Sequence, residues 1–287
     1  MKKIGLITNN KKQKAVNIAM HVYKYLISRK VDVLLLEQDN MPAKYNLPSV
    51  SSDDFSAAAE GIISVGGDGT FLRAARYAFK RQIPVMGINV GNLGFLTEVN
   101  LKDYTIAIDD LLKGSFKIEE RMLLEMVIQR GKRTIGDIDG AFTALNEFTL
   151  TRDMMSKIID LEVIVNGLDV ISFRADGIII ATPTGSTAYS LSAGGPIVEP
   201  MNESVIITPL CAHSLFARSM VISPRNNLEI RLKSKNKNDI LSVDGTKKDI
   251  ILHSGDILKI NKSELKLKLI TFNNNIFFKV FKEKLLK

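Results

Sequence analysis

Hydrophobic positions in the first third of the chain alternate between two spacings. Between residues 15 and 26 apolar residues recur every three or four positions, which predicts an amphipathic helix, and a second helix is predicted over residues 71–80. Short apolar runs predict buried strands at residues 3–8, 31–36, 61–65 and 85–90. Because strands that alternate with helices pair in parallel through right-handed crossovers, we expect a Rossmann-like α/β domain over residues 1–118.

The pattern changes at about residue 119. The segments that follow are short, rich in Ile and Val, and separated by turns such as Asn166-Gly167, which is typical of strands. These strands are predicted at residues 121–129, 144–150, 158–166, 169–174, 177–181, 205–210, 228–232, 240–243 and 257–260. We therefore expect a β-rich, sandwich-like domain over residues 119–270, and a tail, 271–287, that packs on the first domain.

Composition supports a globular protein that carries no strong charge signal. Of the 287 residues, 45% are hydrophobic and 24% are charged, so the chain can bury a sizeable core, and disorder and collagen are excluded. The net charge of +8 comes from basic residues dispersed along the chain, with no Trp and no basic run interleaved with aromatic residues. Nucleic acid is therefore not an expected partner.

Compartment and metal binding follow from what the sequence does not contain. No apolar stretch approaches the roughly 18 residues of a membrane span, and the apolar run near the start is too short for a signal peptide. We expect a cytoplasmic protein with no membrane partner. The single cysteine, Cys211, excludes an internal disulfide, and the three histidines are too dispersed to predict a metal site.

A glycine-rich motif, Gly66-Gly67-Asp68-Gly69-Thr70, lies between a predicted strand and a predicted helix. Its glycines let backbone amides approach an anion closely, and the start of a helix favours phosphate. Asp68 would repel phosphate unless it serves the acceptor hydroxyl; the alternative is a tight turn in which Asp68 caps the helix. The motif is neither GxGxxG nor GxxxxGK[ST], so an ordinary dinucleotide or P-loop site is not favoured.

Two further segments could carry chemistry. The run 176–196 follows a buried strand with hydroxyl-bearing and small residues and one tyrosine, which suits a ribose and an aromatic base. Tyr189 could stack on a base or simply pack in the core. Serine hydrolase chemistry is not predicted, since the run has no GxSxG elbow. The polar pair Asn146-Glu147 interrupts a strand pattern, and its simpler interpretation is an exposed strand face.

These three features occur together and in order, and with them the chain resembles the NAD kinase family. The resemblance runs from about Lys3 to the segment Ser242-Val243-Asp244-Gly245, and the run 176–196 is its most specific part. The glycine-rich motif alone is shared with diacylglycerol kinases, sphingosine kinases and phosphofructokinases. An α/β first part and a β-rich second part are also the family pattern.

The resemblance implies a reaction and a set of site residues. The reaction is phosphorylation of the 2′-hydroxyl of the adenosine ribose of NAD by ATP, giving NADP, with a divalent metal, Mg²⁺, carried by the ATP phosphates. NAD and ATP are the implied small-molecule partners, Asp68 is the implied base, and a homo-oligomer, dimer or tetramer, is implied as well. The positions that match dinucleotide-binding residues of the family are Asp68, Gly69, Arg73, Asn146, Glu147, Lys157, Arg174, Asp176, Thr187, Ala188, Tyr189, Ser190, Leu191, Ser192 and Thr246.

The sequence departs from the family pattern in places, and other functions compete. Thr246 stands where many relatives have glutamine, and His213 is interpreted as a packed, hydrogen-bonded residue. A lipid kinase of the diacylglycerol type would share the glycine-rich motif, but the run 176–196 and the lack of an amphipathic anchoring stretch argue against it. A non-catalytic nucleotide sensor is a third possibility, against which the intact Asp68 argues.

Overall fold

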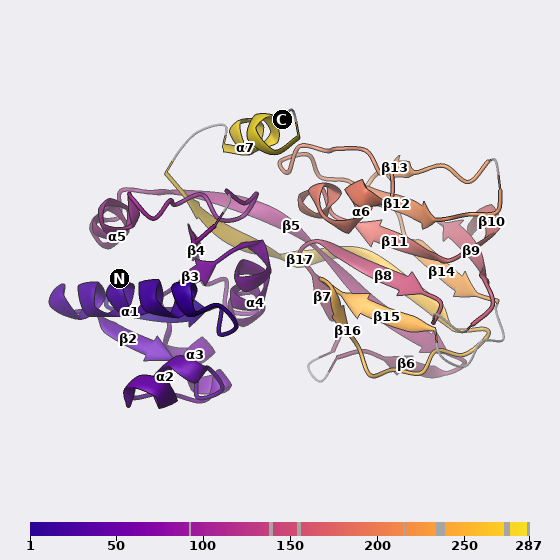
Figure 1. Ribbon diagram of the computed structural model, residues 1–287. Coiled ribbons are helices and arrows are strands. Elements are labelled where there is room, and N and C mark those ends of the chain that lie inside the picture. The colour runs from indigo at the N-terminus through magenta and orange to yellow at the C-terminus, as the bar shows by residue number, and fades with distance from the viewer. Residues whose placement is uncertain are drawn as a thin grey trace. The chain divides into compact units, whose positions relative to one another are not determined.

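The computed structural model describes residues 1–91, 93–137, 140–153, 156–214, 216–233, 239–272 and 276–285. It divides into two compact units (Figure 1), one formed by Met1–Arg121 with Leu265–Lys287 and the other by Met122–Glu264. No helix in these described ranges is long and apolar enough to cross a membrane.

A parallel sheet forms the centre of the first unit. Its strands β1 (Lys3–Thr8), β2 (Asp32–Leu35), β3 (Gly61–Gly66) and β4 (Val85–Asn89) are hydrogen-bonded in the order β4-β3-β1-β2. Both faces are covered at the centre of this sheet, since every residue of β3 and β4 is buried. This is the α/β arrangement predicted from the sequence.

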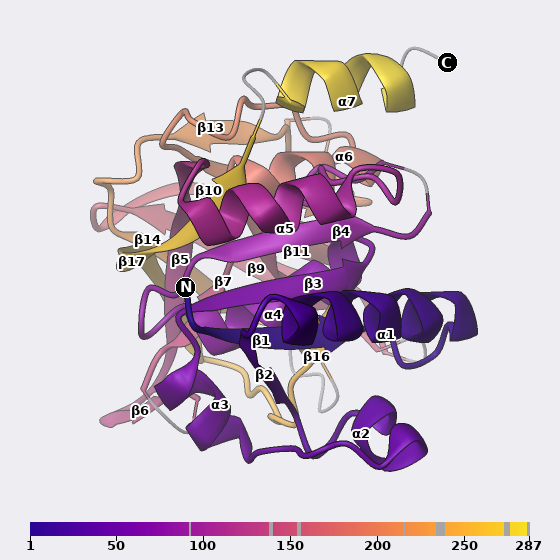
Figure 2. The same ribbon diagram turned by 90° about the vertical axis from the view of Figure 1, so that its left-hand side faces the viewer.

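The described residues of this unit also form the helices α1 (Gln13–Ser28), α2 (Asn40–Tyr45), α3 (Ser52–Ala58), α4 (Asp68–Ala78), α5 (Tyr104–Lys113) and α7 (Ile276–Leu285). The predicted apolar stripe of α1 packs against β1 and β3 and beside α5 (Figure 2), while α4 packs against β3 and β4 and beside α3. Helices α2, α3, α5 and α7 were not predicted from the sequence. The start of α4 was predicted three residues late, because Gly67 is extended and the helix begins directly at Asp68.

The second unit is built from antiparallel strands. One sheet has the order β13-β12-β11-β8-β15-β16, and β10, β9, β14 and the first part of β17 are neighbours in another, to which β5, β6 and β7 also belong. One apolar core contains side chains from both sheets, such as Phe148 and Ile180 from the first and Leu161 and Ile230 from the second. Two sheets that share a core form a sandwich, so the sandwich-like fold class is confirmed.

Strand bounds in this part of the chain are β5 (Lys117–Arg130), β6 (Arg133–Ile135), β7 (Phe142–Ala144), β8 (Glu147–Thr151), β9 (Ile159–Val165), β10 (Leu168–Ala175), β11 (Gly177–Ala181), β12 (Val205–Leu210), β13 (Met220–Ile222), β14 (Leu228–Leu232), β15 (Ile240–Val243), β16 (Thr246–Lys247) and β17 (Ile257–Thr271). Two short helices, η1 (Thr184–Thr187) and α6 (Tyr189–Ser192), follow β11. β17 runs well past the predicted strand 257–260, and its last residues belong to the first unit, where Leu269 pairs with Val85 of β4.

Candidate active site

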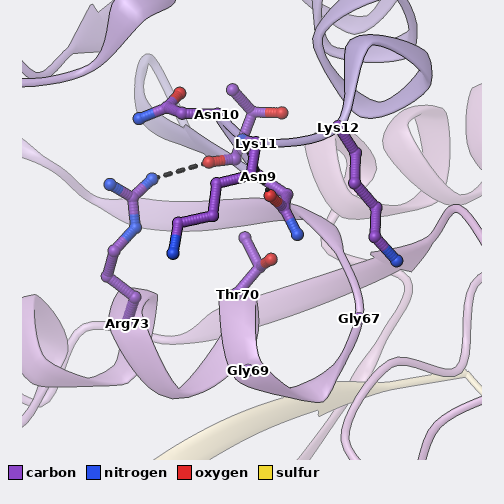
Figure 3. Close-up of a pocket in the computed structure, with 9 residues that line it drawn as sticks. Asn9, Asn10, Lys11, Lys12, Gly67, Gly69, Thr70 and Arg73 are labelled. Carbon is purple, nitrogen blue, oxygen red and sulfur yellow. Dashed lines mark hydrogen bonds between the residues drawn. The ribbon is translucent and has the colours of Figure 1, made fainter. Parts of the chain in front are cut away.

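A polar cavity of about 520 Å³ lies in the first unit, at the carboxyl ends of β1 and β3 (Figure 3). In open parallel sheets this edge is where ligands usually bind. The lining residues come from the segment after β1 and from the start of α4: Thr8, Asn9, Asn10, Lys11, Lys12, Gly67, Gly69, Thr70 and Arg73. Three of the side chains are cationic, and the beginning of α4 contributes partial positive charge, so the cavity is suited to an anion such as a phosphate chain. We refer to it as the phosphate pocket.

Arg73 is held firmly at the edge of this pocket. Its guanidinium donates two hydrogen bonds to the Asp39 carboxylate, at 2.6 and 3.0 Å, and a third to the Thr8 carbonyl oxygen at 2.7 Å. Figure 3 draws the contact with Thr8 as a dashed line. The planar fork of an arginine is well suited to such fixed geometry.

The Asp68 carboxylate does not line the phosphate pocket. Its Oδ2 accepts a hydrogen bond from the Phe95 amide at 3.0 Å. Its Oδ1 accepts from the Leu96 amide at 3.1 Å and from the Thr97 hydroxyl at 3.2 Å. Lys284 of α7 places its Nζ 3.9 Å from Oδ2. The interpretation of Asp68 as a helix cap is therefore wrong, since Gly67 is the N-cap and the carboxylate binds the segment 95–97 instead.

The position of the Asp68 carboxylate against the segment 95–97 can be tested by a substitution at Gly94. A Cβ atom added to Gly94 would lie 2.0 Å from Asp68 Oδ1 and 2.4 Å from Thr97 Oγ1, so Gly94→Ala must displace the carboxylate. The family resemblance implies that Asp68 is the base, and a small misplacement of a reacting group is costly, so we expect this variant to lose kcat by about tenfold or more. Steady-state kinetics would show this, and wild-type kinetics in a folded Gly94→Ala protein would contradict it.

In the second unit, Asp244 organises the segment that precedes β8. Asp244 has a left-handed φ of 46° and is followed by Gly245 at 70°. Its carboxylate accepts hydrogen bonds from the amides of Leu145, Asn146 and Glu147, at 3.1, 2.7 and 3.2 Å. β7 ends at Ala144 and β8 begins at Glu147, so the strand predicted over 144–150 is confirmed for residues 147–150 but is interrupted at 145–146.

Glu147 is a buried carboxyl group next to this turn. Only 4% of the residue is exposed, and Asn146 is also buried, so the interpretation of the pair as an exposed strand face is wrong. Burial, and secondarily the charge of Asp244, raise the pKa of Glu147 to about 8, against a smaller opposing effect from the Tyr189 amide. Its Oε2 has no hydrogen-bond partner among the described residues.

Hydroxyl groups in the run 176–196 are used mainly within the protein. Thr182 donates to the Leu145 carbonyl oxygen at 2.5 Å, Ser186 donates to that of Val198 at 3.0 Å, and the buried Ser190 shares a bond with Thr208. Tyr189, by contrast, is 46% exposed, so its ring is not buried in the core. Thr187, Ala188 and Leu191 are partly exposed and Ser192 is exposed.

The remaining predicted positions of this unit lie nearer the surface. Arg174 pairs with Asp160 at 3.0 Å, and Asp176 with Arg152 at 2.5 Å. Lys157 and Thr246 are exposed, and so is His213, which corrects its interpretation as a packed residue.

Sequence reasoning did not single out several residues of these sites. Lys11 and Lys12 follow β1 at the ligand-binding edge of the sheet, a position that could have indicated them. Asp244 had the signal of an Asp-Gly turn after a strand. No local sequence pattern indicated that Arg152 and Asp160 would pair with predicted site residues.

Comparisons with known proteins agree over the whole chain. The family models for the ATP-NAD kinase N-terminal domain and C-terminal domain match residues 4–116 and 145–272. An NAD kinase of Moorella thermoacetica is 36% identical over 285 residues, covering 99% of this chain and 89% of its own. One of Thermoanaerobacter sp. strain X514 is 38% identical, covering 99% of both. The chain belongs to the NAD kinase family.

As an NAD kinase family member, the protein is a phosphotransferase, and the lipid kinase alternative is not favoured. Two solved structures resemble its fold. Yeast NADH kinase complexed with NADH has a TM-score of 0.89 at 23% identity and covers 100% of this chain and 87% of that one. An NAD kinase from Archaeoglobus fulgidus in complex with ATP has a TM-score of 0.73 at 28% identity and covers 97% of this chain and 98% of that one.

Proposed function

We propose that this protein transfers the γ-phosphoryl group of ATP to the 2′-hydroxyl of the adenosine ribose of NAD, giving NADP and ADP. The observation that carries the proposal is the phosphate pocket at the start of α4, with Asp68 on the same strand-to-helix turn. Membership of the NAD kinase family supports the choice of acceptor. Phosphoryl transfer needs positioning and charge neutralisation more than covalent chemistry, and this turn offers both.

The donor phosphates are proposed to occupy the phosphate pocket. Lys11, Lys12 and Arg73 would neutralise their charge, and the amides at the start of α4 would bind their oxygens. The family resemblance implied that Arg73 contacts NAD; we assign it to the donor because it lines this pocket. The described residues contain no group of three or more His, Cys, Asp or Glu side chains that could hold a metal. The side chains that line the phosphate pocket include no carboxylate, which fits Mg²⁺ bound through phosphate oxygens and water rather than in a protein cage. Such a metal supplies neutralisation of the developing charge.

Asp68 is proposed to orient the acceptor hydroxyl and to accept its proton. The ribose oxygen forms a bond to the γ-phosphorus, the bond from that phosphorus to the β-bridging oxygen breaks, ADP leaves with the bonding electrons, and the hydroxyl proton passes to the carboxylate. Hydrogen bonds from Phe95, Leu96 and Thr97 would hold the carboxylate in place. Positioning then contributes more than basicity, because an aspartate is ordinarily a weak base.

The dinucleotide is proposed to contact residues of the second unit. The exposed ring of Tyr189 offers a face for the adenine. The family resemblance assigns the buried pair Asn146 and Glu147 to contacts with the dinucleotide. Arg174 and Asp176 would contribute polar contacts as well. We also propose a homo-oligomer, in keeping with the family resemblance.

The function is tested by incubating purified protein with NAD, ATP and Mg²⁺ and measuring NADP with an NADP-specific dehydrogenase. We expect NADP to form, and to require both ATP and the metal. Parallel reactions with diacylglycerol vesicles serve as the control. Lipid phosphate without NADP would overturn the proposal.

A further inference from the structure

Asp39 is a buried acidic residue next to the phosphate pocket. It lies between β2 and α2, and its side chain is only 3% exposed. An aspartate directly before a helix usually accepts a hydrogen bond from the first amides of that helix. Asp39 occupies the N-cap of α2 but makes no such bond. Its carboxylate therefore serves another purpose.

The hydrogen-bond partners of the Asp39 carboxylate indicate its role. Oδ1 accepts hydrogen bonds from Arg73 Nη1 at 2.6 Å and from Asn10 Nδ2 at 3.1 Å, and Oδ2 accepts from Arg73 Nη2 at 3.0 Å. Arg73 and Asn10 both line the phosphate pocket, whereas Asp39 does not. One buried carboxylate thus connects two pocket side chains that come from different elements.

The charge balance is consistent with an anion site. A carboxylate beside phosphate is unfavourable by itself, but this one is buried and bidentately paired with Arg73. Lys11 and Lys12 add positive charge to the same pocket. The Asp39 carboxylate weakens the attraction of Arg73 for an anion. It also fixes the Arg73 side chain in one conformation, so less conformational entropy is lost when the anion binds.

We propose that Asp39 is a positioning residue that orients Arg73 and Asn10 toward the phosphate chain of the donor. The identity of the anion as donor phosphate rests on the proposed function. The positioning role itself does not depend on it, because Arg73 and Asn10 line the pocket whatever anion it binds.

The first test compares Asp39→Asn with the wild type in NADP formation. Asparagine keeps the size but offers Arg73 one acceptor in place of two. We expect the KM for ATP to rise about tenfold, the scale of one hydrogen bond to a charged group, with kcat within about threefold. Asp109→Asn is the matched control, since it breaks an exposed pair with Arg29 in the same unit and should leave both constants unchanged. Asp39→Asn with a wild-type KM for ATP, whether or not its melting temperature falls, would overturn the proposal.

A double-mutant cycle shows whether Asp39 acts through Arg73. In an Arg73→Met background, Asp39→Asn should raise the KM for ATP by less than about twofold, whereas a full additive effect contradicts the proposal. Should Asp39→Asn not fold, Arg73→Lys keeps the charge but loses the bidentate fork, and a similar rise in KM is expected. An unchanged KM in folded Arg73→Lys would then refute the positioning role.

Calorimetric titration with inorganic tripolyphosphate separates this proposal from the proposed function, because it needs no NAD. Weaker binding of tripolyphosphate by Asp39→Asn than by the wild type supports the positioning role even if no NADP is formed. Equal binding by the two proteins argues against it even if NADP formation is normal.

Discussion

Asp68→Asn is expected to lower kcat for NADP formation by about 10²-fold or more, the usual scale for loss of a positioned general base. It should also lower the melting temperature. The carboxylate accepts from the amides of Phe95 and Leu96 with different oxygens, whereas asparagine has one acceptor oxygen and would turn its NH₂ group toward one of these donors. An unsatisfied buried donor costs about 1–3 kcal/mol. Both quantities should be measured on one preparation.

Because folding and catalysis are both affected, a second variant is needed to separate them. Thr97→Val keeps the Asp68 carboxylate but removes the hydroxyl that donates to it and that accepts from Asn89. We expect a lower melting temperature for Thr97→Val as well, with kcat reduced by less than about tenfold. If Asp68→Asn matches Thr97→Val in both measurements, Asp68 has a structural role and the catalytic assignment is wrong.

Elements with a strong local pattern could be predicted from the sequence. Strands β1, β3 and β4 are mostly apolar and almost entirely buried, and α1 has a continuous apolar face, so local spacing alone indicated them. Helix α3 buries only Phe55, and α2 has six residues including a proline, so neither offers a periodic pattern. The break between β7 and β8 depends on Asp244, which is distant in sequence, and no local pattern reports it.

The parts of the candidate site that belong to a sequence motif could be predicted, whereas the parts that depend on tertiary contacts could not. The glycine-rich motif and Asn146-Glu147 stand out in the sequence because they interrupt apolar segments. That Asp68 faces the segment 95–97 and not the phosphate pocket depends on how that segment folds over α4. The role of Asp39 likewise depends on a pairing with Arg73 that no spacing rule predicts.

The free energy of unfolding is expected to decrease as the pH rises from about 4.5 to 8, through Glu147. Its pKa is about 8 in the folded protein and near 4.5 when exposed, so between these values the folded state binds more protons than the unfolded state. Raising the pH then favours unfolding, and the effect levels off above pH 8. The size of the effect is on the order of a few kcal/mol, since one pKa unit corresponds to about 1.4 kcal/mol.

Glu147→Gln should remove this dependence, because glutamine fills the same space and does not titrate. Urea unfolding of both proteins at pH 5, 6.5 and 8 measures the effect, with Glu199→Gln, an exposed carboxylate of the same unit, as the control that should follow the wild type. Parallel profiles for the wild type and Glu147→Gln would show that Glu147 is ionised throughout.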